Sequence, residues 1–420
     1  MKRFRWILAL AAVLIFCQTE SVQALQDTEE TAETAETAET AETAETAETA
    51  ETAGSADKAD ELVKQQAEAL ETDSIGEFWD DIISEYGGLL PESQKGSLLE
   101  FMNGEKSFSP QEWLKALFSY LFHEVLANGK LLGTLILLTI FCVILQMLQN
   151  AFQQSTVSKV AYSIVYMVLI ILALNSFHVA ITYASEAIQT MTSFILALIP
   201  MLLALMASSG GAVSAAFFHP VILFLMNTSG LLIQNIVMPL IFLSAILSIV
   251  STMTDQYKVT QLAGLLRKIA IGALAVFLTI FLGVISVQGT SAAVTDGITL
   301  RTAKFITGNF IPVLGRMFTD ATDTVISASL LLKNTVGIIG VAILICIAAF
   351  PAIKVLSLAF IYKLAAAILQ PLGGGPVITC LDVISRSVLY IFAALAIVSL
   401  MFFLSITVII TAGNLTMMMK

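Results

Sequence analysis

This sequence has little charge. Only 13% of its 420 residues are Asp, Glu, Lys or Arg, about half the share of an average soluble protein. The 68 residues from Ala187 to Thr254 include none of these, and His219 is their single ionisable group. A helix that is apolar on every side is unstable in water, and this length corresponds to about three crossings of a ~30 Å bilayer core. The lack of charge excludes a soluble globular protein and predicts an all-α polytopic membrane protein.

Signatures of enzymes and of metal sites are also missing. The four cysteines stand singly in apolar stretches without a CxxC pair, and the three histidines are far apart in sequence. No phosphate-loop, zinc-protease or serine-hydrolase motif occurs, and the triple glycine at 373–375 lacks the lysine of a phosphate loop. No concentrated basic segment suits nucleic acid. We therefore expect no catalysis, no cofactor, no metal and no nucleic-acid partner.

The charge that is present lies unevenly along the chain. The net charge is −11, but residues 25–108 hold 23 acidic residues against four lysines. Residues 109–420 hold 14 basic residues against eight acidic ones. An acidic N-terminal segment therefore precedes a mildly basic membrane domain at 128–420.

Residues 1–24 have the pattern of a secretory signal peptide. Three basic residues precede a short apolar core, and Val22-Gln23-Ala24 resembles a cleavage site. The alternative is an uncleaved first span. Either reading places the following segment on the outer side of the membrane.

The segment 25–56 is predicted to be disordered. Residues 31–53 are seven consecutive Thr-Ala-Glu triplets followed by Thr-Ala, and a period of three keeps no helix face apolar. The segment is either an acidic spacer or a repeat without a specific role.

Residues 57–127 are predicted to form a small helical extracytoplasmic domain. Ser74 and Glu77 fit a capping box, and Gly87-Gly88 ends the helix that follows. A second start lies at Ser109-Pro110, before an apolar stripe rich in aromatic residues. This later helix lies either in the membrane interface or inside the small domain.

Seven to nine transmembrane helices are expected in the membrane domain. The predicted spans are Leu131–Leu148, Val160–Tyr183, Ser193–Ala207, Val213–Ile233, Asn235–Val250, Ile269–Val287, Val336–Phe350, Val355–Leu369 and Val388–Thr411, and 297–333 stays open. With the N-terminal segment outside, five crossings bring the basic loop Lys258–Lys268 inside, as the positive-inside rule requires.

Several of these spans contain polar or helix-breaking residues at membrane depth. Freed backbone groups there must be satisfied by protein or by a water-filled cavity. The residues either line a translocation path or serve helix–helix hydrogen bonding and packing. The candidates for path-lining or helix-break positions are Pro200, Asn227, Gln234, Asn235, Pro239, Pro312, Asn334, Pro351, Gly373, Gly374 and Gly375.

Some of these landmarks recur in the same order. Ile199-Pro200 recurs as Ile311-Pro312, and Asn227-Thr228 recurs as Asn334-Thr335. The pattern indicates either a parallel repeat of 190–290 and 302–412 or a chance match between apolar sequences.

From Asp73 onward the chain resembles the stage III sporulation protein AE family of endospore-forming bacteria. The motifs that carry the resemblance are Ile75-Gly-Glu-Phe-Trp-Asp80, Leu90-Pro-Glu-Ser-Gln-Lys-Gly96, Ser107-Phe-Ser-Pro-Gln-Glu-Trp-Leu114, Ser209-Gly-Gly-Ala-Val-Ser-Ala-Ala-Phe-Phe-His-Pro220 and Leu372-Gly-Gly-Gly-Pro376. The resemblance implies a multi-pass protein of the mother-cell membrane around the forespore. Its implied partners are the lipid bilayer, the other stage III sporulation A-operon proteins and, through them, stage II sporulation protein Q.

The function implied by the resemblance is a channel or permease-like subunit of the complex that joins mother cell and forespore and sustains late forespore gene expression. A non-conducting membrane scaffold for the same complex is the alternative. A solitary secondary transporter comes third, because charged coupling residues are lacking in the uncharged block.

Overall fold

The computed structural model describes residues 73–88, 110–151, 156–253, 259–310, 314–372 and 375–418. This part of the chain is helical apart from short turns, which confirms the all-α prediction for it. The chain divides into two units, 1–58 and 59–420, and all described residues belong to the second. The predicted signal peptide and the acidic repeat lie outside the described residues.

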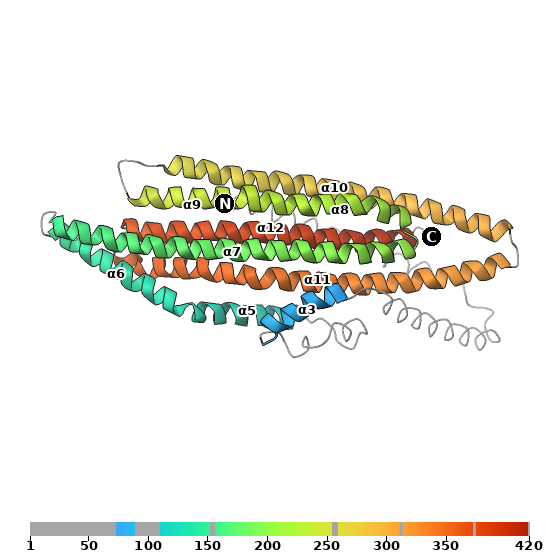
Figure 1. Ribbon diagram of the computed structural model, residues 1–420, viewed down its shortest axis with the longest axis horizontal. Coiled ribbons are helices and arrows are strands. Elements are labelled where there is room, and N and C mark those ends of the chain that lie inside the picture. The colour runs from blue at the N-terminus through green and yellow to red at the C-terminus, as the bar shows by residue number, and fades with distance from the viewer. Residues whose placement is uncertain are drawn as a thin grey trace, which may run out of the picture. The chain divides into compact units, whose positions relative to one another are not determined.

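The described helices follow one another with short connections (Figure 1). They are α3 (Asp73–Tyr86), α5 (Pro110–Ala127), α6 (Gly129–Ala151), α7 (Thr156–Ser208), α8 (Ala212–Leu232), η2 (Ile233–Val237), α9 (Met238–Met253), α10 (Thr260–Phe310), α11 (Leu314–Leu369), η3 (Gln370–Leu372) and α12 (Pro376–Met418). Because α8, η2 and α9 adjoin without a gap, they form one long helix with a π-helical turn in its middle.

Six of the described helical segments are long and apolar enough to cross a membrane. The expected seven to nine spans are not confirmed, because three pairs of predicted spans each form one continuous helix. These helices are α7, α8–α9 and α11, and they pass through Pro200, Pro239 and Pro351 without a break. A proline removes one backbone hydrogen bond, at a cost of about 3 kcal/mol, and burial of apolar residues on both sides of it offsets this loss.

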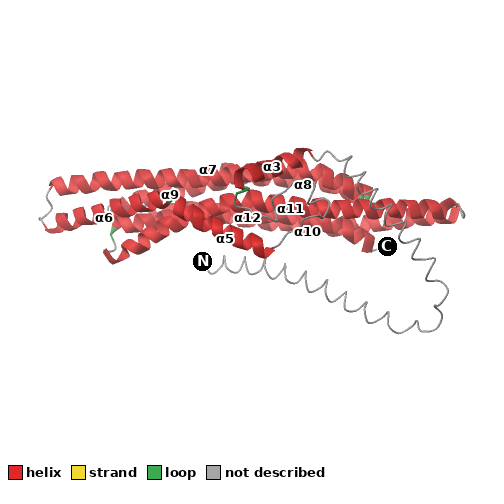
Figure 2. Ribbon diagram, turned by 90° about the horizontal axis from the view of Figure 1, so that it is seen from below, coloured by secondary structure: helices red, strands yellow, loops and turns green. Residues whose placement is uncertain are grey.

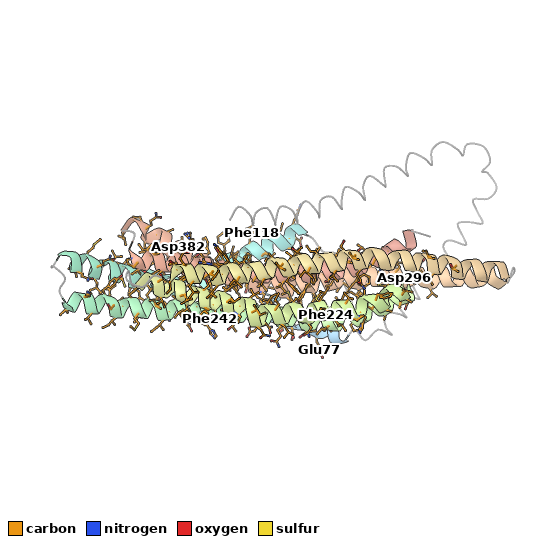
Figure 3. The ribbon with its side chains drawn as sticks, turned by 90° about the horizontal axis from the view of Figure 1, so that it is seen from above. Glu77, Phe118, Phe224, Phe242, Asp296 and Asp382 are labelled. Atoms are coloured by element: carbon orange, nitrogen blue, oxygen red, sulfur yellow. The ribbon has the colours of Figure 1, made fainter. Side chains whose placement is uncertain are left out.

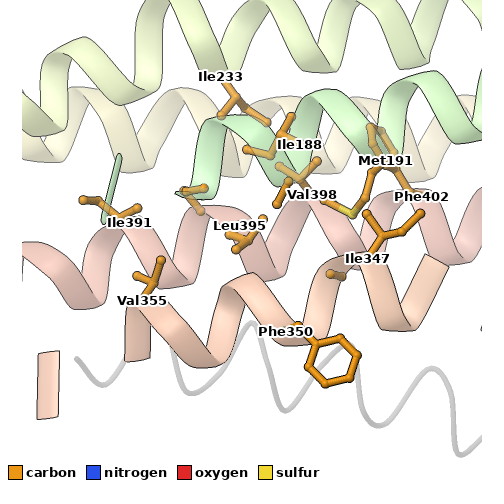
Figure 4. Packing of buried hydrophobic residues seen from close by; sticks show 14 of the residues in the cluster. Ile188, Met191, Ile233, Ile347, Phe350, Val355, Ile391, Leu395, Val398 and Phe402 are labelled. Atoms are coloured by element: carbon orange, nitrogen blue, oxygen red, sulfur yellow. The ribbon is translucent and has the colours of Figure 1, made fainter. Parts of the chain in front are cut away.

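The core of the bundle lies where α7, α11 and α12 meet. Figure 4 shows Met191 of α7, Ile347 of α11 and Phe402 of α12 among the packed side chains, and all three are buried. α12 also contacts α9 and α10, so it is surrounded by other helices on most sides. In Figure 2, α3, α7 and α8 lie along one side of the bundle, while α5 and α10 lie along the other.

The two predicted N-terminal helices are present as α3 and α5. Gly87 donates its N–H to the carbonyl of Ile83 at the end of α3, and α5 begins at Pro110. They are not confirmed as a separate small domain, since α3 packs against α7 and α11, and α5 packs against α11. An amphipathic helix must bury its apolar stripe, and the nearest apolar surface is the membrane bundle.

Candidate functional site

The contacts of α3 and α5 meet at one residue of the bundle, Phe350 in α11. The Tyr86 ring of α3 stacks on the Phe350 ring with 4.0 Å between centroids and 4° between planes. The Tyr120 ring of α5 meets the same Phe350 ring edge-on at 5.3 Å. Both N-terminal helices therefore lie at the same level of the bundle, beside Pro351.

A lysine one turn further along α11 holds the end of α3. Lys354 Nζ lies 3.2 Å from Glu85 Oε1 and 3.3 Å from the Tyr86 hydroxyl. It also lies 5.2 Å from the centroid of the Tyr86 ring and 5.3 Å from that of Tyr183 in α7. Burial raises the pKa of Tyr86 well above its ordinary value, so its hydroxyl stays neutral. The cluster joins α3 to α7 and α11.

The outer faces of α3 and α5 suit different media. α5 exposes a stripe of large apolar side chains, with Leu114 58%, Phe118 62% and Phe122 67% exposed. α3 exposes four acidic side chains: Glu77, Asp80, Asp81 and Glu85. Figure 3 shows Phe118 and Glu77 on opposite sides of the bundle. At the level of Phe350, one side of the bundle therefore suits lipid, while the opposite side suits water.

α7, which packs against α3, also exposes polar residues. Asn175, His178, Glu186 and Gln189, here named the α7 polar stripe, are all exposed. The candidate span is Lys159–Ser208, and a bilayer crossing takes about 20 residues. Any 20 consecutive residues of this span include at least one member of the stripe. Wherever the bilayer crosses α7, a polar side chain therefore faces outward from the bundle.

A second outward row lies on α8 and η2. Asn227 and Asn235 are exposed, and they alternate with the exposed Phe224 (68%) and Leu231 (52%). We name these four residues the amide ridge; Figure 3 shows Phe224 on the same side as Glu77. Any 20 consecutive residues of the span Ala212–Thr252 contain Asn227, Asn235 or both. The ridge therefore also presents an amide at membrane depth.

The π-helical turn η2 explains how Pro239 fits without breaking the helix. The N–H of Met238 donates to the carbonyl of Ile233, five residues back. A proline ring clashes with the carbonyl four residues earlier, and a wider turn just before the proline relieves this clash. Gln234 is half-buried, while Asn235 and Pro239 are exposed. Turns of this kind are frequent at functional sites.

The predicted site residues thus fall into separate groups. Pro200 on α7 is exposed, and so are Asn227, Asn235 and Pro239 along α8, η2 and α9. Pro351 is half-buried beside Phe350, and Asn334 is half-buried on α11 with no hydrogen-bond partner for its buried Oδ1. Gly375 lies against Gln146 of α6. Pro312, Gly373 and Gly374 lie outside the described residues.

Two buried charges were not predicted as site residues. Asp296 of α10 accepts hydrogen bonds from the N–H groups of Val213 (3.0 Å) and Ser214 (3.1 Å) at the start of α8. Lys333 of α11 donates to the carbonyl of Ile410 (2.9 Å) and to Asn414 Oδ1 (3.1 Å). The sequence feature that could have pointed to Asp296 is the helix start after Gly210-Gly211. Glycine offers no side chain to cap α8, so a capping group must come from elsewhere.

Comparison with known proteins places the chain in a family. No group of His, Cys, Asp and Glu in the described part could hold a metal ion. The family model for stage III sporulation protein AE matches residues 93–413. The chain is 84% identical to the stage III sporulation protein AE of Bacillus subtilis (strain 168) over the full length of both proteins. No solved structure matches it. The chain therefore belongs to the stage III sporulation protein AE family.

Proposed function

We propose that this protein is a membrane-embedded, permease-like subunit of a channel that sustains late forespore gene expression. The path runs along the side of the bundle formed by α3 and the α7 polar stripe, and neighbouring subunits close it. It does not run through the interior of a single chain. The protein acts in the mother-cell membrane around the forespore. Its partners there are other stage III sporulation A-operon proteins and, through them, stage II sporulation protein Q.

The chain belongs to a sporulation family that is not a known family of enzymes, and six apolar helical segments in its described part indicate a multi-pass membrane protein. The role as a channel subunit, the location in the mother-cell membrane and the partners are what we propose.

The observation that supports a lateral path is the contrast between two outer faces at the level of Phe350. The outer face of α5 is apolar, and the outer face of α3 is acidic. A bilayer is planar, so a lipid-facing α5 and an acidic α3 at the same level require water on the α3 side. The exposed Asn175, His178, Glu186 and Gln189 extend that polar side along α7.

The interior of the bundle offers no comparable row of polar groups in the described part of the chain. Buried hydroxyls such as those of Ser244 and Ser385 donate to the carbonyls of Ala263 and Ala359 on neighbouring helices. Large apolar side chains fill the space between α7, α11 and α12. These two buried serines therefore join neighbouring helices, as expected in membrane bundles.

The alternative is a scaffold that anchors the other components and conducts nothing. The cluster of Lys354, Tyr86 and Phe350 favours it, because it fixes α3 to the bundle. A scaffold gives no role to the α7 polar stripe other than contact with another protein.

Polar-to-apolar substitutions that leave the amount of membrane-inserted protein unchanged distinguish the two functions. Gln189→Leu and His178→Leu alter the α7 polar stripe, whereas Thr279→Leu replaces an exposed polar residue of α10 whose hydroxyl is bonded to Ala275 within its own helix. We expect reduced late forespore reporter activity at normal protein levels for the first two, and unchanged activity for Thr279→Leu.

The prolines extend this test. Pro200→Leu and Pro312→Leu should insert normally and impair late forespore activity. The measurements are membrane-inserted protein and reporter activity in the same cells. If activity follows abundance in every variant, the conducting path is wrong and the scaffold stands.

A further inference from the structure

The amide ridge does not suit lipid. Phe224 and Leu231 are well exposed, so the row is too apolar for a water-lined wall. Asn227 and Asn235 alternate with them, and an amide in hydrocarbon without partners costs several kcal/mol. Every possible crossing of this span includes one of these amides. A mixed row of this kind is typical of a helix–helix contact inside a membrane.

The outer face of α10 provides the contrast. Between Ile269 and Val287 it exposes apolar residues such as Val276 (61%) and Ile280 (54%). Its exposed Thr279 hydroxyl donates to the carbonyl of Ala275, 2.9 Å away in the same helix. This face therefore satisfies its own polar groups and is compatible with lipid. No such internal partner for Asn227 or Asn235 is present in the described part of the chain.

We propose that the amide ridge is the site at which a second copy of this chain binds, through Asn227 and Asn235 at membrane depth. All copies insert with the same orientation, so a two-fold axis along the membrane normal places each residue opposite its own counterpart at the same depth. A side-chain amide both donates and accepts hydrogen bonds, and it can therefore pair with an identical amide.

The chemistry of the ridge is what selects a second copy. Identical carboxylates or identical ammonium groups would repel each other across such an axis, whereas identical amides bond. The two asparagines are eight residues apart, which is about 12 Å along the helix, and Leu231 lies midway between them. Two nearly parallel ridges therefore form two amide pairs with a leucine contact between them. The inference does not require that the path described above conducts.

Oxidative cross-linking of single cysteines tests this contact. In a chain whose Cys17, Cys142, Cys346 and Cys380 are changed to Ala, we introduce Asn227→Cys or Asn235→Cys, with Val276→Cys and Ile280→Cys of α10 as matched exposed controls. Two differently tagged copies are expressed together, and their membranes are treated with copper phenanthroline. We expect a disulfide-linked product carrying both tags for the two ridge cysteines and none for the α10 cysteines.

A second measurement uses the intact ridge. Co-purification of the two tagged copies should fall by about tenfold for the double variant Asn227→Leu and Asn235→Leu, since each amide pair in a membrane contributes about 0.6 kcal/mol or more. The double variant with Gln at both positions should keep most of the association.

Several outcomes would overturn the proposal. Ridge cysteines that react with a lipid-soluble maleimide yet give no product with both tags would show that no second copy binds there. A product with a protein of another mass alone would assign the ridge to a different partner. Equal cross-linking of the α10 cysteines would show random collision of copies.

Discussion

The start of α8 depends on a carboxylate from another helix. Gly211 occupies the N-cap position and offers no side chain, while Gly210 adopts a φ of 92° that reverses the chain after α7. Asp296 of α10 then supplies both acceptors for the free N–H groups of Val213 and Ser214. An anion at a helix N-terminus also interacts favourably with the helix dipole.

Asp296→Ala should lower the thermal stability of the purified protein. It leaves two backbone donors unsatisfied, one of them buried, and loss of a capping group costs about 1–2 kcal/mol. We expect a melting temperature in detergent that is several degrees lower, measured by intrinsic tryptophan fluorescence. Glu77→Ala, which removes an exposed acidic residue of α3, is the control and should leave the melting temperature unchanged. An equal effect in both variants would argue against the cap.

Two glycines of α11 allow close approach of neighbouring helices. A Cβ at Gly340 would lie 2.6 Å from Leu198 Cδ2 of α7, and one at Gly337 would overlap with Ile410 Cδ1 of α12. Small residues at such positions let membrane helices pack closely.

Gly340→Leu should therefore destabilise the bundle, by roughly 1–3 kcal/mol if the neighbours shift to make room. Gly283→Leu on α10 is the matched control, because nothing lies within 4 Å of a Cβ at that position. The measurement is the fraction of membrane-inserted protein that survives detergent extraction and heating as a monodisperse species. Equal survival of the two variants would contradict the packing of α11 against α7.

At the scale of elements, α3 is fixed to the bundle by aromatic contacts and one lysine. The Phe78 ring of α3 meets the Phe194 ring of α7 edge-on at 5.4 Å, and Tyr86 stacks on Phe350. Lys354 adds an ion pair with Glu85 and two ring contacts. Because Glu85 is 59% exposed, the ion pair contributes little by itself, and the ring contacts carry more of the attraction.

Lys354→Met should loosen α3 while the bundle stays folded. Loss of the ring contacts corresponds to about 1 kcal/mol or more, or about a fivefold rise in local opening. Hydrogen exchange of the backbone amides of residues 75–86 in detergent should accelerate accordingly. Lys363→Met, which removes a partner of Asp382 elsewhere on α11, is the control. Unchanged exchange of α3 in Lys354→Met would mean that the lysine does not hold it.

At the scale of the whole molecule, three basic residues lie at the end of the bundle where α10 and α12 begin and α11 ends. Lys363 near the end of α11 and Arg386 near the start of α12 both pair with Asp382, and Arg267 near the start of α10 lies over the Tyr390 ring at 5.2 Å. From the positive-inside rule we expect this end in the cytoplasm. If the N-terminal segment lies outside, three crossings by α6, α7 and α8–α9 bring the chain to this end inside the cell. The five crossings predicted from the sequence gave the same side, because three and five are both odd.

With six crossings, the C-terminus should lie on the same side as α3. Single cysteines at Ser84, Gln261 and Lys420, in a chain without its own cysteines, are labelled with a membrane-impermeant thiol reagent in vegetative cells that express the protein. We expect labelling at Ser84 and Lys420, and labelling at Gln261 only after the cells are opened. Labelling of Gln261 but not Ser84 in intact cells would invert the topology.

The acidic repeat should be dispensable. Its Thr-Ala-Glu period leaves no apolar face, so it has nothing to bury against the membrane domain. Deletion of Thr31–Thr52 should leave the spore count of a sporulating culture near that of the parent strain. Deletion of the 18 residues of α5, which contacts α11, should abolish spores. Loss of spores at normal protein levels after the first deletion would show that the repeat has a specific role.

The sequence by itself determined the features that depend on composition and local chemistry. The uncharged residues 187–254 required helices in a membrane, because lipid leaves backbone groups no other partners. The proline and capping residues at Ser109-Pro110 and the Gly87 stop predicted the bounds of α5 and α3 within a few residues. The motifs from Asp73 onward indicated the family.

Only the tertiary structure decided how these pieces combine. Pro200, Pro239 and Pro351 were predicted as candidate helix-break positions, yet each lies in a continuous helix, because burial against neighbouring helices and the π turn at η2 compensate for a lost hydrogen bond. The directions in which Asn227, Asn235 and Gln189 point depend on which helices cover α7 and α8, and local sequence does not encode that. The partner of Asp296 lies more than 80 residues away in the chain, so only the packing of α10 against α8 brings the two together.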